Sequence, residues 1–183
     1  MTLLAYLFVA LAVAVRLLPH EFHFTPVAAS LLFFGATVGA ARNGRRQMWI
    51  PVALLAASDF YLTVFHYKLP WSWLYFGVSL AWYAAMVLLG SMLAKRETAA
   101  KIVGASLTAS ISFFIVTNAI SPWIIPATYT KDVHGVVAAL AAGVPFFRPT
   151  LVSDLFFTAV AFGSPYALRA VERMLHSQGS ATA

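Results

Sequence analysis

The segment SISFFIVTNAISPW, at residues 110–123, decides the fold class because it is an apolar stretch that ends in polar and ring side chains. Its last turns carry Thr117, Asn118 and Trp123. Unpaired polar groups are costly in hydrocarbon, and tryptophan favours the membrane–water interface. The pattern therefore predicts a transmembrane helix that leaves the bilayer near Trp123. If other segments bring polar residues to the same level, that level is the candidate functional site.

The composition is typical of an integral membrane protein. The chain has 183 residues, of which 61% are hydrophobic and 10% are charged. A soluble domain of this size could not bury so much apolar side chain, and its surface would be left mostly apolar. Cysteine is absent, which excludes disulfides and thiolate metal sites. We expect one transmembrane domain at residues 1–175 and a disordered tail at residues 176–183.

Six apolar segments are long enough to cross a bilayer as helices, which takes about 17–25 residues. They are Thr2–Leu18, Phe24–Ala41, Met48–Phe65, Trp73–Ala94, Ile102–Ser121 and Thr150–Ala170. The apolar piece Val133–Phe147 is shorter and contains Gly143 and Pro145, so we expect a re-entrant or surface helix there. The predicted fold is all-α, with six transmembrane helices and this short helix before the last span.

Basic residues flank alternate segments, which predicts the orientation. They follow the second, fourth and sixth segments, at residues 42–46, 95–101 and 169–173. Because cytoplasmic loops carry an excess of Lys and Arg, we expect both termini in the cytoplasm. The loops at residues 19–23, 66–72 and 122–149 then face outward. This topology accounts for the net charge of +6, so we do not expect nucleic-acid binding.

Small residues recur four positions apart in the first two segments, as Ala10-x-x-x-Ala14 and Gly35-x-x-x-Gly39. Such spacing lets helix backbones approach closely. In a chain so rich in alanine, packing within the bundle is the preferred interpretation, and a docking face for a partner is the alternative.

Two carboxylates, Asp59 and Asp154, lie inside predicted spans, in their outer parts. A carboxylate at such a position costs at least about 2.5–3.5 kcal/mol on insertion scales unless it faces a cavity or a cation. One interpretation is an internal ion pair with Arg16 or Arg148 that only positions helices. The other is that these groups handle a ligand or a proton, and the two interpretations are compatible.

Four of the five histidines lie in or beside the predicted outer loops, namely His20, His23, His66 and His134. Neutral imidazole suits zinc, copper, nickel or cobalt, whereas interfacial histidines without a metal are the alternative. His66 is the candidate metal ligand, because it follows Asp59 by seven residues and so lies two helical turns along the same face.

Aromatic residues also gather toward the predicted outer side. An interfacial belt is one explanation, and a pocket for a ring-bearing solute is the other, since such sites combine aromatic walls with a few polar groups. In the second case the candidate ligand-binding residues are Asp59, His66, Trp71, Thr117, Asn118, Trp123, Tyr129 and Asp154.

Motifs of catalysis and nucleotide use are missing from the sequence. It contains no HExxH motif and no glycine-rich phosphate loop, and Ser106 lies in the inner half of its segment, away from every histidine. We therefore expect a transport or binding protein rather than an enzyme. A membrane enzyme or assembly factor that uses Asp and His groups at the outer face is the alternative.

A set of short motifs resembles an uncharacterised bacterial family of small six-span membrane proteins, which in turn looks like the S-components of energy-coupling-factor (ECF) vitamin transporters. The resemblance covers roughly residues 15–165. The motifs are Arg16 with Pro19, Phe24-Thr25-Pro26, Ser58-Asp59, Phe114-x-x-Thr117-Asn118, Trp123, Gly135, Pro145-Phe146-Phe147 and Asp154-Leu155.

The resemblance implies a six-helix bundle of the bacterial inner membrane that binds a vitamin or vitamin precursor near its outer face for uptake. It also implies an ECF-type coupling subunit and ATPases as partners. Some solitary relatives of this kind are proposed to transport cobalamin, which makes cobalamin a candidate transported ligand. Some of those use a cysteine toward cobalt, and His66 would have to take that role here.

The charge pattern predicts that Gly44 and Thr98 are cytoplasmic and that His20, Lys68 and Lys131 are external. Single cysteines at these positions of a naturally cysteine-free chain can be tested with a membrane-impermeant thiol reagent on intact cells. We expect labelling only at the three external positions. Labelling from outside at position 44 would reverse the orientation.

Overall fold

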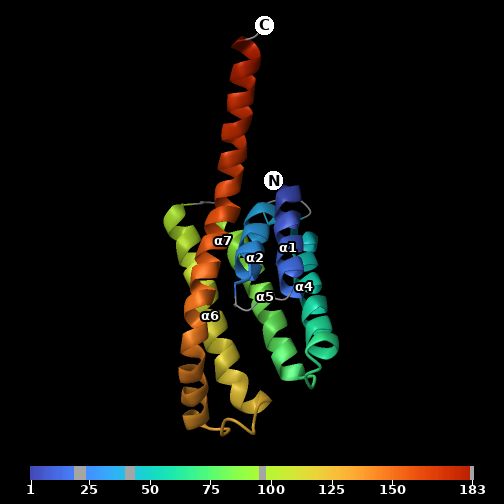
Figure 1. The fold of residues 1–183 in the computed structure, drawn as a ribbon, viewed down its shortest axis with the longest axis vertical. Helices are drawn as coiled ribbons and strands as arrows, with labels where there is room; N and C mark the ends of the chain where they lie inside the picture. The colour runs from blue at the N-terminus through green and yellow to red at the C-terminus, as the bar shows by residue number, and fades with distance from the viewer. Residues whose placement is uncertain (19–23, 40–43, 95–97, 182–183) are drawn as a thin grey trace.

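The computed structural model describes residues 1–18, 24–39, 44–94 and 98–181, and the regular secondary structure within these residues is all helical (Figure 1). This confirms the predicted all-α class. The helices are α1 (Thr2–Leu17), α2 (Val27–Val38), α3 (Gly44–Gln47), α4 (Trp49–Tyr61), the π-helical turn η1 (Leu62–His66), α5 (Trp73–Leu93), α6 (Ala99–Ile124) and α7 (Val133–Ala181).

In the described part of the chain, four helical segments are long and apolar enough to cross a membrane: α4 with η1, α5, α6 and α7. Helices α1 and α2 are also apolar but have only 16 and 12 residues. The chain is therefore treated as a membrane protein with four full-length candidate spans and two shorter apolar helices, where six full spans were expected.

Side-chain caps define where three helices begin. Ser72 accepts a hydrogen bond from the N–H of Tyr75 at the start of α5, and Thr98 accepts one from the N–H of Lys101 at the start of α6. Before α7, the carboxylate of Asp132 accepts hydrogen bonds from the Gly135 N–H and the Thr130 hydroxyl. These bonds to the ionised form hold the pKa of Asp132 below its usual value.

Helix α7 corrects the prediction of a separate re-entrant or surface helix at Val133–Phe147. The helix is continuous from Val133 to Ala181, with Pro145, Pro149 and Pro165 inside it. A proline removes one hydrogen bond and kinks a helix, but a helix in an apolar environment continues through it because neighbouring helices support the freed backbone. The predicted disordered tail is helical at residues 176–181, and residues 182–183 lie outside the described part.

Gly143, read from the sequence as a helix breaker, instead serves helix packing. A Cβ atom built at this position would overlap the Asn118 side chain of α6. The glycine therefore lets α6 and α7 approach closely, as small residues do at helix interfaces in membranes.

The helices run antiparallel, so that residues 66–72 and 125–132 share one end of the bundle, called here the predicted outer end. Both termini lie toward the opposite end (Figure 1). The hairpin formed by α1 and α2 stops partway along the bundle, whereas α4 to α7 continue to the predicted outer end. We call the described residues at this end of the hairpin, residues 16–18 and 24–26, the hairpin tip.

Helix α2 occupies the centre of the core. Ten of its twelve residues are buried, which suits a sequence that is apolar on all sides. The fully buried large apolar side chains of these helices come from four of them: Val9 of α1, Leu31, Leu32, Phe34 and Val38 of α2, Leu55 of α4 and Val87 of α5.

Two glycines bring α2 and α5 into backbone contact. A Cβ atom at Gly35 would overlap the carbonyl of Val87, and one at Gly90 would overlap the carbonyl of Leu32. Gly39 similarly faces Ser91. The Gly35-x-x-x-Gly39 motif therefore serves packing inside the bundle, as expected, whereas Ala10 and Ala14 are exposed on α1.

The same geometry refines the labelling positions. A side chain at Gly44 would overlap the carbonyl of Val38, so the neighbouring exposed residue Arg46 is the better position for a cysteine.

Replacing Gly90 by Ala should lower the free energy of unfolding by about 1–3 kcal/mol, because the added methyl group forces α2 and α5 apart. Gly104→Ala is the matched control, because no neighbouring atom lies within 4 Å of a Cβ atom at this position. Its free energy of unfolding should stay the same or rise by up to about 1 kcal/mol, since alanine has the higher helix propensity. Thermal melting in detergent compares the two. Equal stability of both variants would contradict the close α2–α5 contact.

Candidate functional site

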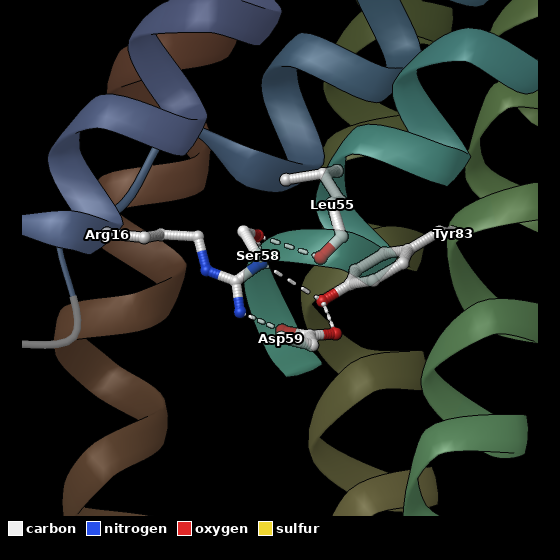
Figure 2. A network of polar contacts seen from close by, with 5 residues as sticks. All are labelled: Arg16, Leu55, Ser58, Asp59 and Tyr83. Atoms are coloured by element: carbon white, nitrogen blue, oxygen red, sulfur yellow. Dashed lines mark hydrogen bonds and ion pairs between the residues drawn. The ribbon is translucent and has the colours of Figure 1, made fainter. Parts of the chain in front are cut away.

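A buried polar network joins α1, α4 and α5 at the hairpin tip (Figure 2). Arg16 of α1 forms an ion pair with Asp59 of α4. The Tyr83 hydroxyl of α5 donates a 2.8 Å hydrogen bond to Oδ2 of the same carboxylate. Arg16 Nη1 also donates to the Tyr83 hydroxyl at 3.3 Å and to the Ser58 hydroxyl at 3.2 Å. We call these four residues the Arg16–Asp59 network.

The network compensates its buried charges internally. Asp59 is only 8% exposed, and the Arg16 side chain is 16% exposed. Arg16 lies in the last turn of α1, where the unpaired helix carbonyls favour a positive charge. The ion-pair interpretation of Asp59 with Arg16 is therefore what the structure shows, and a ligand role for Asp59 stays a prediction.

Tyr75 extends the polar face of α5 toward the predicted outer end. Its hydroxyl is close enough to Asp59, Arg16 and Ser79 to interact with all three side chains. The residue as a whole is 38% exposed. Neither Tyr75 nor Tyr83 was among the predicted site residues. Their spacing with Ser79, four residues apart on one helix face, was the available signal.

Asp154 lies in a second polar cluster, between α6 and α7. The Ser110 hydroxyl donates a 2.6 Å hydrogen bond to Asp154 Oδ2, and the Thr158 hydroxyl donates to the Ser106 hydroxyl at 3.1 Å. All four residues are buried, with Asp154 5% exposed. We call them the α6–α7 hydroxyl cluster. Within the described residues no basic side chain pairs with Asp154, so neither Arg16 nor Arg148 is its partner.

The hairpin tip also contacts α7. The Ser153 hydroxyl donates a 3.2 Å hydrogen bond to the Thr25 carbonyl, and the ring of Phe24 lies 5.0 Å from that of Phe157. The Arg16–Asp59 network therefore holds one side of the tip against α4 and α5, and these contacts hold the other side against α7.

Thr117 and Asn118 form part of the contact between helices. The Thr117 hydroxyl donates to the Phe113 carbonyl at 2.7 Å, and the Asn118 amide donates to the Phe114 carbonyl at 2.8 Å. Both side chains are half-buried, and Asn118 packs against Gly143. Their amide oxygen and hydroxyl can still accept hydrogen bonds.

The remaining predicted site residues lie at the predicted outer end, in two groups. Exposed His66 and half-buried Trp71 belong to the end of α4 and α5. Trp123, which is 49% exposed, and Tyr129 belong to the end of α6 and the turn after it. In the described part of the chain, no ring contact or hydrogen bond joins the two groups, so their assembly around a solute stays a prediction.

Trp71 lies in an aromatic cluster with three neighbours. Its ring centroid lies 5.1 Å from that of Phe60, 4.9 Å from that of Phe76 and 5.5 Å from that of Trp73. Its indole N–H is buried and has no hydrogen-bond acceptor among the described residues. Such a donor is costly to leave unpaired, so an acceptor on a bound molecule would be favoured there.

Among the described residues, no three His, Asp or Glu side chains lie close enough together to hold a metal ion. The structure therefore adds no support to the metal interpretation. His66 contacts only the ring of Tyr67, at 4.8 Å, among the ring contacts of the structure's described part. His20 and His23 lie outside the described residues. The role of His66 as a cobalt ligand stays a prediction.

An open groove of about 470 Å³ lies beside the hairpin tip. It is lined by Phe24 of the tip and by Arg148, Pro149 and Val152 of α7. A larger groove of about 660 Å³ lies between α2, α4 and α5, toward the opposite end of the bundle, and is lined mainly by apolar side chains such as Met48, Trp49 and Leu88.

The amino-acid sequence matches a protein family over residues 1–176, described as a family of unknown function (DUF6580). Because the match spans nearly the whole chain, the protein belongs to this family. No curated protein and no solved structure shows significant similarity to the chain. The match agrees with the expected membership of a family without an assigned function, and it does not test the expected likeness to S-components.

Replacing Arg16 by Met should lower the free energy of unfolding by about 3–5 kcal/mol, because Asp59 would remain buried without a cation. The double variant Arg16→Met/Asp59→Leu should recover most of this loss, and Tyr83→Phe should cost about 1 kcal/mol. Melting in detergent measures each, with the exposed Arg169→Met as control. A double variant no more stable than Arg16→Met would show that the two charges are not coupled.

Proposed function

We propose that this member of the DUF6580 family binds a small ring-bearing solute, a vitamin or vitamin precursor, from the predicted outer side and serves its uptake across the bacterial inner membrane. The observation that carries the proposal is the position of the Arg16–Asp59 network at a hairpin tip that stops partway along the bundle. Charged groups inside membrane bundles mark solute pathways, and transporter sites form where helices end within the membrane.

The helices that continue past the tip supply polar and aromatic groups for such a site. Tyr75 lies on the predicted outer side of the Arg16–Asp59 network and is partly exposed. Phe60, Trp71 and Phe76 add an aromatic cluster farther along α4 and α5. Solute sites combine such apolar walls with a small number of placed polar groups.

Two groups beside this region have unused binding capacity. The Trp71 indole N–H has no acceptor in the described part of the chain, and a carbonyl or ring nitrogen of a solute would satisfy it. Arg148 lines the groove beside the tip with Phe24 and forms no ion pair with a described carboxylate. A solute with a carboxylate or phosphate group would suit that guanidinium.

The six-span, S-component-like interpretation belongs to this proposal. In it, α1 and α2 count as the first two spans, and both termini are cytoplasmic. An ECF-type coupling subunit and ATPases supply the energy, and the exposed Ala10 and Ala14 on α1 leave a small-residue surface that a partner helix can approach. Cobalamin is one candidate solute, with the exposed His66 as its candidate cobalt ligand.

The test is binding of a vitamin and corrinoid panel to the purified protein, followed by tryptophan fluorescence and by mass spectrometry of the bound compound. Tyr75→Phe should weaken binding of the active compound by about 1–3 kcal/mol, or roughly 5- to 150-fold, through loss of a placed hydroxyl. Tyr166→Phe is the matched control, because this tyrosine is exposed on α7.

Three outcomes count against the proposal. One is the absence of any fluorescence change across the panel. Another is equal affinity of Tyr75→Phe and Tyr166→Phe. Conversion of the bound compound, with a pH-dependent rate and no uptake, would favour the alternative of a membrane enzyme over a transporter.

A further inference from the structure

Asp154 is a buried carboxyl group whose charge nothing in the described structure compensates. It is 5% exposed, and only its Oδ2 atom accepts a hydrogen bond from a described residue, the Ser110 hydroxyl. Ser110 lies eleven residues into the 26-residue helix α6, about 17 Å along its axis, so the group is near the middle of the span. An uncompensated negative charge at that depth is strongly unfavourable.

Among the described residues, no other charged or titratable group pairs with Asp154. The helices that pack along α7 are α2 and α6: α2 carries no titratable side chain, and α6 carries only Lys101, exposed in its first turn. On α7 itself, the nearest such group is Arg148, which lines the groove beside Phe24. The two buried carboxylates therefore differ in their partners. Asp59 has both a guanidinium and a tyrosine hydroxyl, whereas Asp154 has no described cation.

One hydroxyl contacts Asp154 directly, and two more lie one helical turn along the same α6–α7 contact. The Ser106 and Ser110 hydroxyls come from successive turns of α6, and the Thr158 hydroxyl comes from α7, one turn beyond Asp154. The Ser106 hydroxyl accepts the hydrogen bond from Thr158, and no described acceptor takes its own hydrogen. Carboxylate and hydroxyl oxygens are the ligands that hard cations prefer. A single carboxylate balances one positive charge, which selects a monovalent ion.

We propose that the α6–α7 hydroxyl cluster is a binding site for one monovalent cation, a sodium ion or a proton, with Asp154 as the group that carries the compensating charge. A sodium ion would use the Asp154 carboxylate and the hydroxyl oxygens of Ser106, Ser110 and Thr158. A proton would need only the carboxyl group, with the Ser110 hydroxyl as its hydrogen-bond partner. The site binds its ion whether or not a solute is present.

The site deepens the proposed uptake function, because ion binding at the α6–α7 interface would supply coupling to an ion gradient. That coupling rests on the proposed function, whereas ion binding itself does not. The experiment therefore measures ion binding on the purified chain without any solute, so that failure of one proposal leaves the other measurable.

The test compares thermal melting of the detergent-solubilised protein in NaCl and in choline chloride of equal ionic strength at pH 8, together with equilibrium binding of radioactive sodium. A sodium site should raise the melting temperature by about 5–10 °C at a hundredfold excess over the dissociation constant. A proton site should show no sodium effect but a comparable rise when choline chloride samples are taken from pH 8 to pH 5.

Variants assign the response to the cluster. Asp154→Asn, which carries a neutral amide, should remove the response and melt in ion-free buffer as high as the ion-loaded parent protein. Ser110→Ala keeps the carboxyl group and should weaken the sodium response about tenfold while preserving a proton response, which keeps the test decisive if Asp154→Asn does not fold. Thr108→Ala is the matched control, because its hydroxyl lies on an exposed face and bonds the Gly104 carbonyl of its own helix.

A melting temperature of the parent protein that responds to neither sodium nor pH would overturn the proposal. So would an equal response of Asp154→Asn and the parent, since the ion would then bind elsewhere. Asp132→Asn, which alters an exposed carboxylate outside the spans, should respond like the parent.

Discussion

The attraction between Arg16 and Asp59 across a poorly polarisable interior determines how far the α1–α2 hairpin enters the bundle. Neither charge could remain at that depth alone, because desolvation of an unpaired ion exceeds what helix packing contributes. With the pair formed, α1 can end inside the bundle, and Tyr83 satisfies the remaining carboxylate oxygen. The hairpin tip, its contact with α7 and the groove beside it all follow from that short first helix.

The interior is divided into two kinds of contact. Around α2, glycines and large apolar side chains make a close-packed core with almost no polar groups. Between α6 and α7, hydroxyl and amide side chains of α6 lie along the contact from Ser106 to Asn118. The residues of α7 that meet them are Thr158, Asp154 and Gly143. The first contact is held by van der Waals packing, and the second by hydrogen bonds that can be rearranged.

Much of the secondary structure was predictable because hydrophobic length and capping residues are local signals. The start of α5 at Trp73, after the Ser72 cap, is an example. The continuity of α7 was not predictable, because the effect of Pro145 depends on neighbouring helices that the sequence does not reveal. The sequence offered Arg16 and Arg148 equally as partners for Asp59, and only the three-dimensional packing distinguishes them.

The length of α7 has a mechanical consequence. Its 49 residues correspond to about 74 Å, against about 40–45 Å for a whole bilayer, and its C-terminal part stands clear of the bundle (Figure 1). From Asp154 to Ala181 the helix forms a lever of about 40 Å. A tilt of about 5° at the α6–α7 contact would move the far end by roughly 3–4 Å. A small tilt of α7 beside Asp154 would thus move the C-terminal end of the helix by about the size of a side chain.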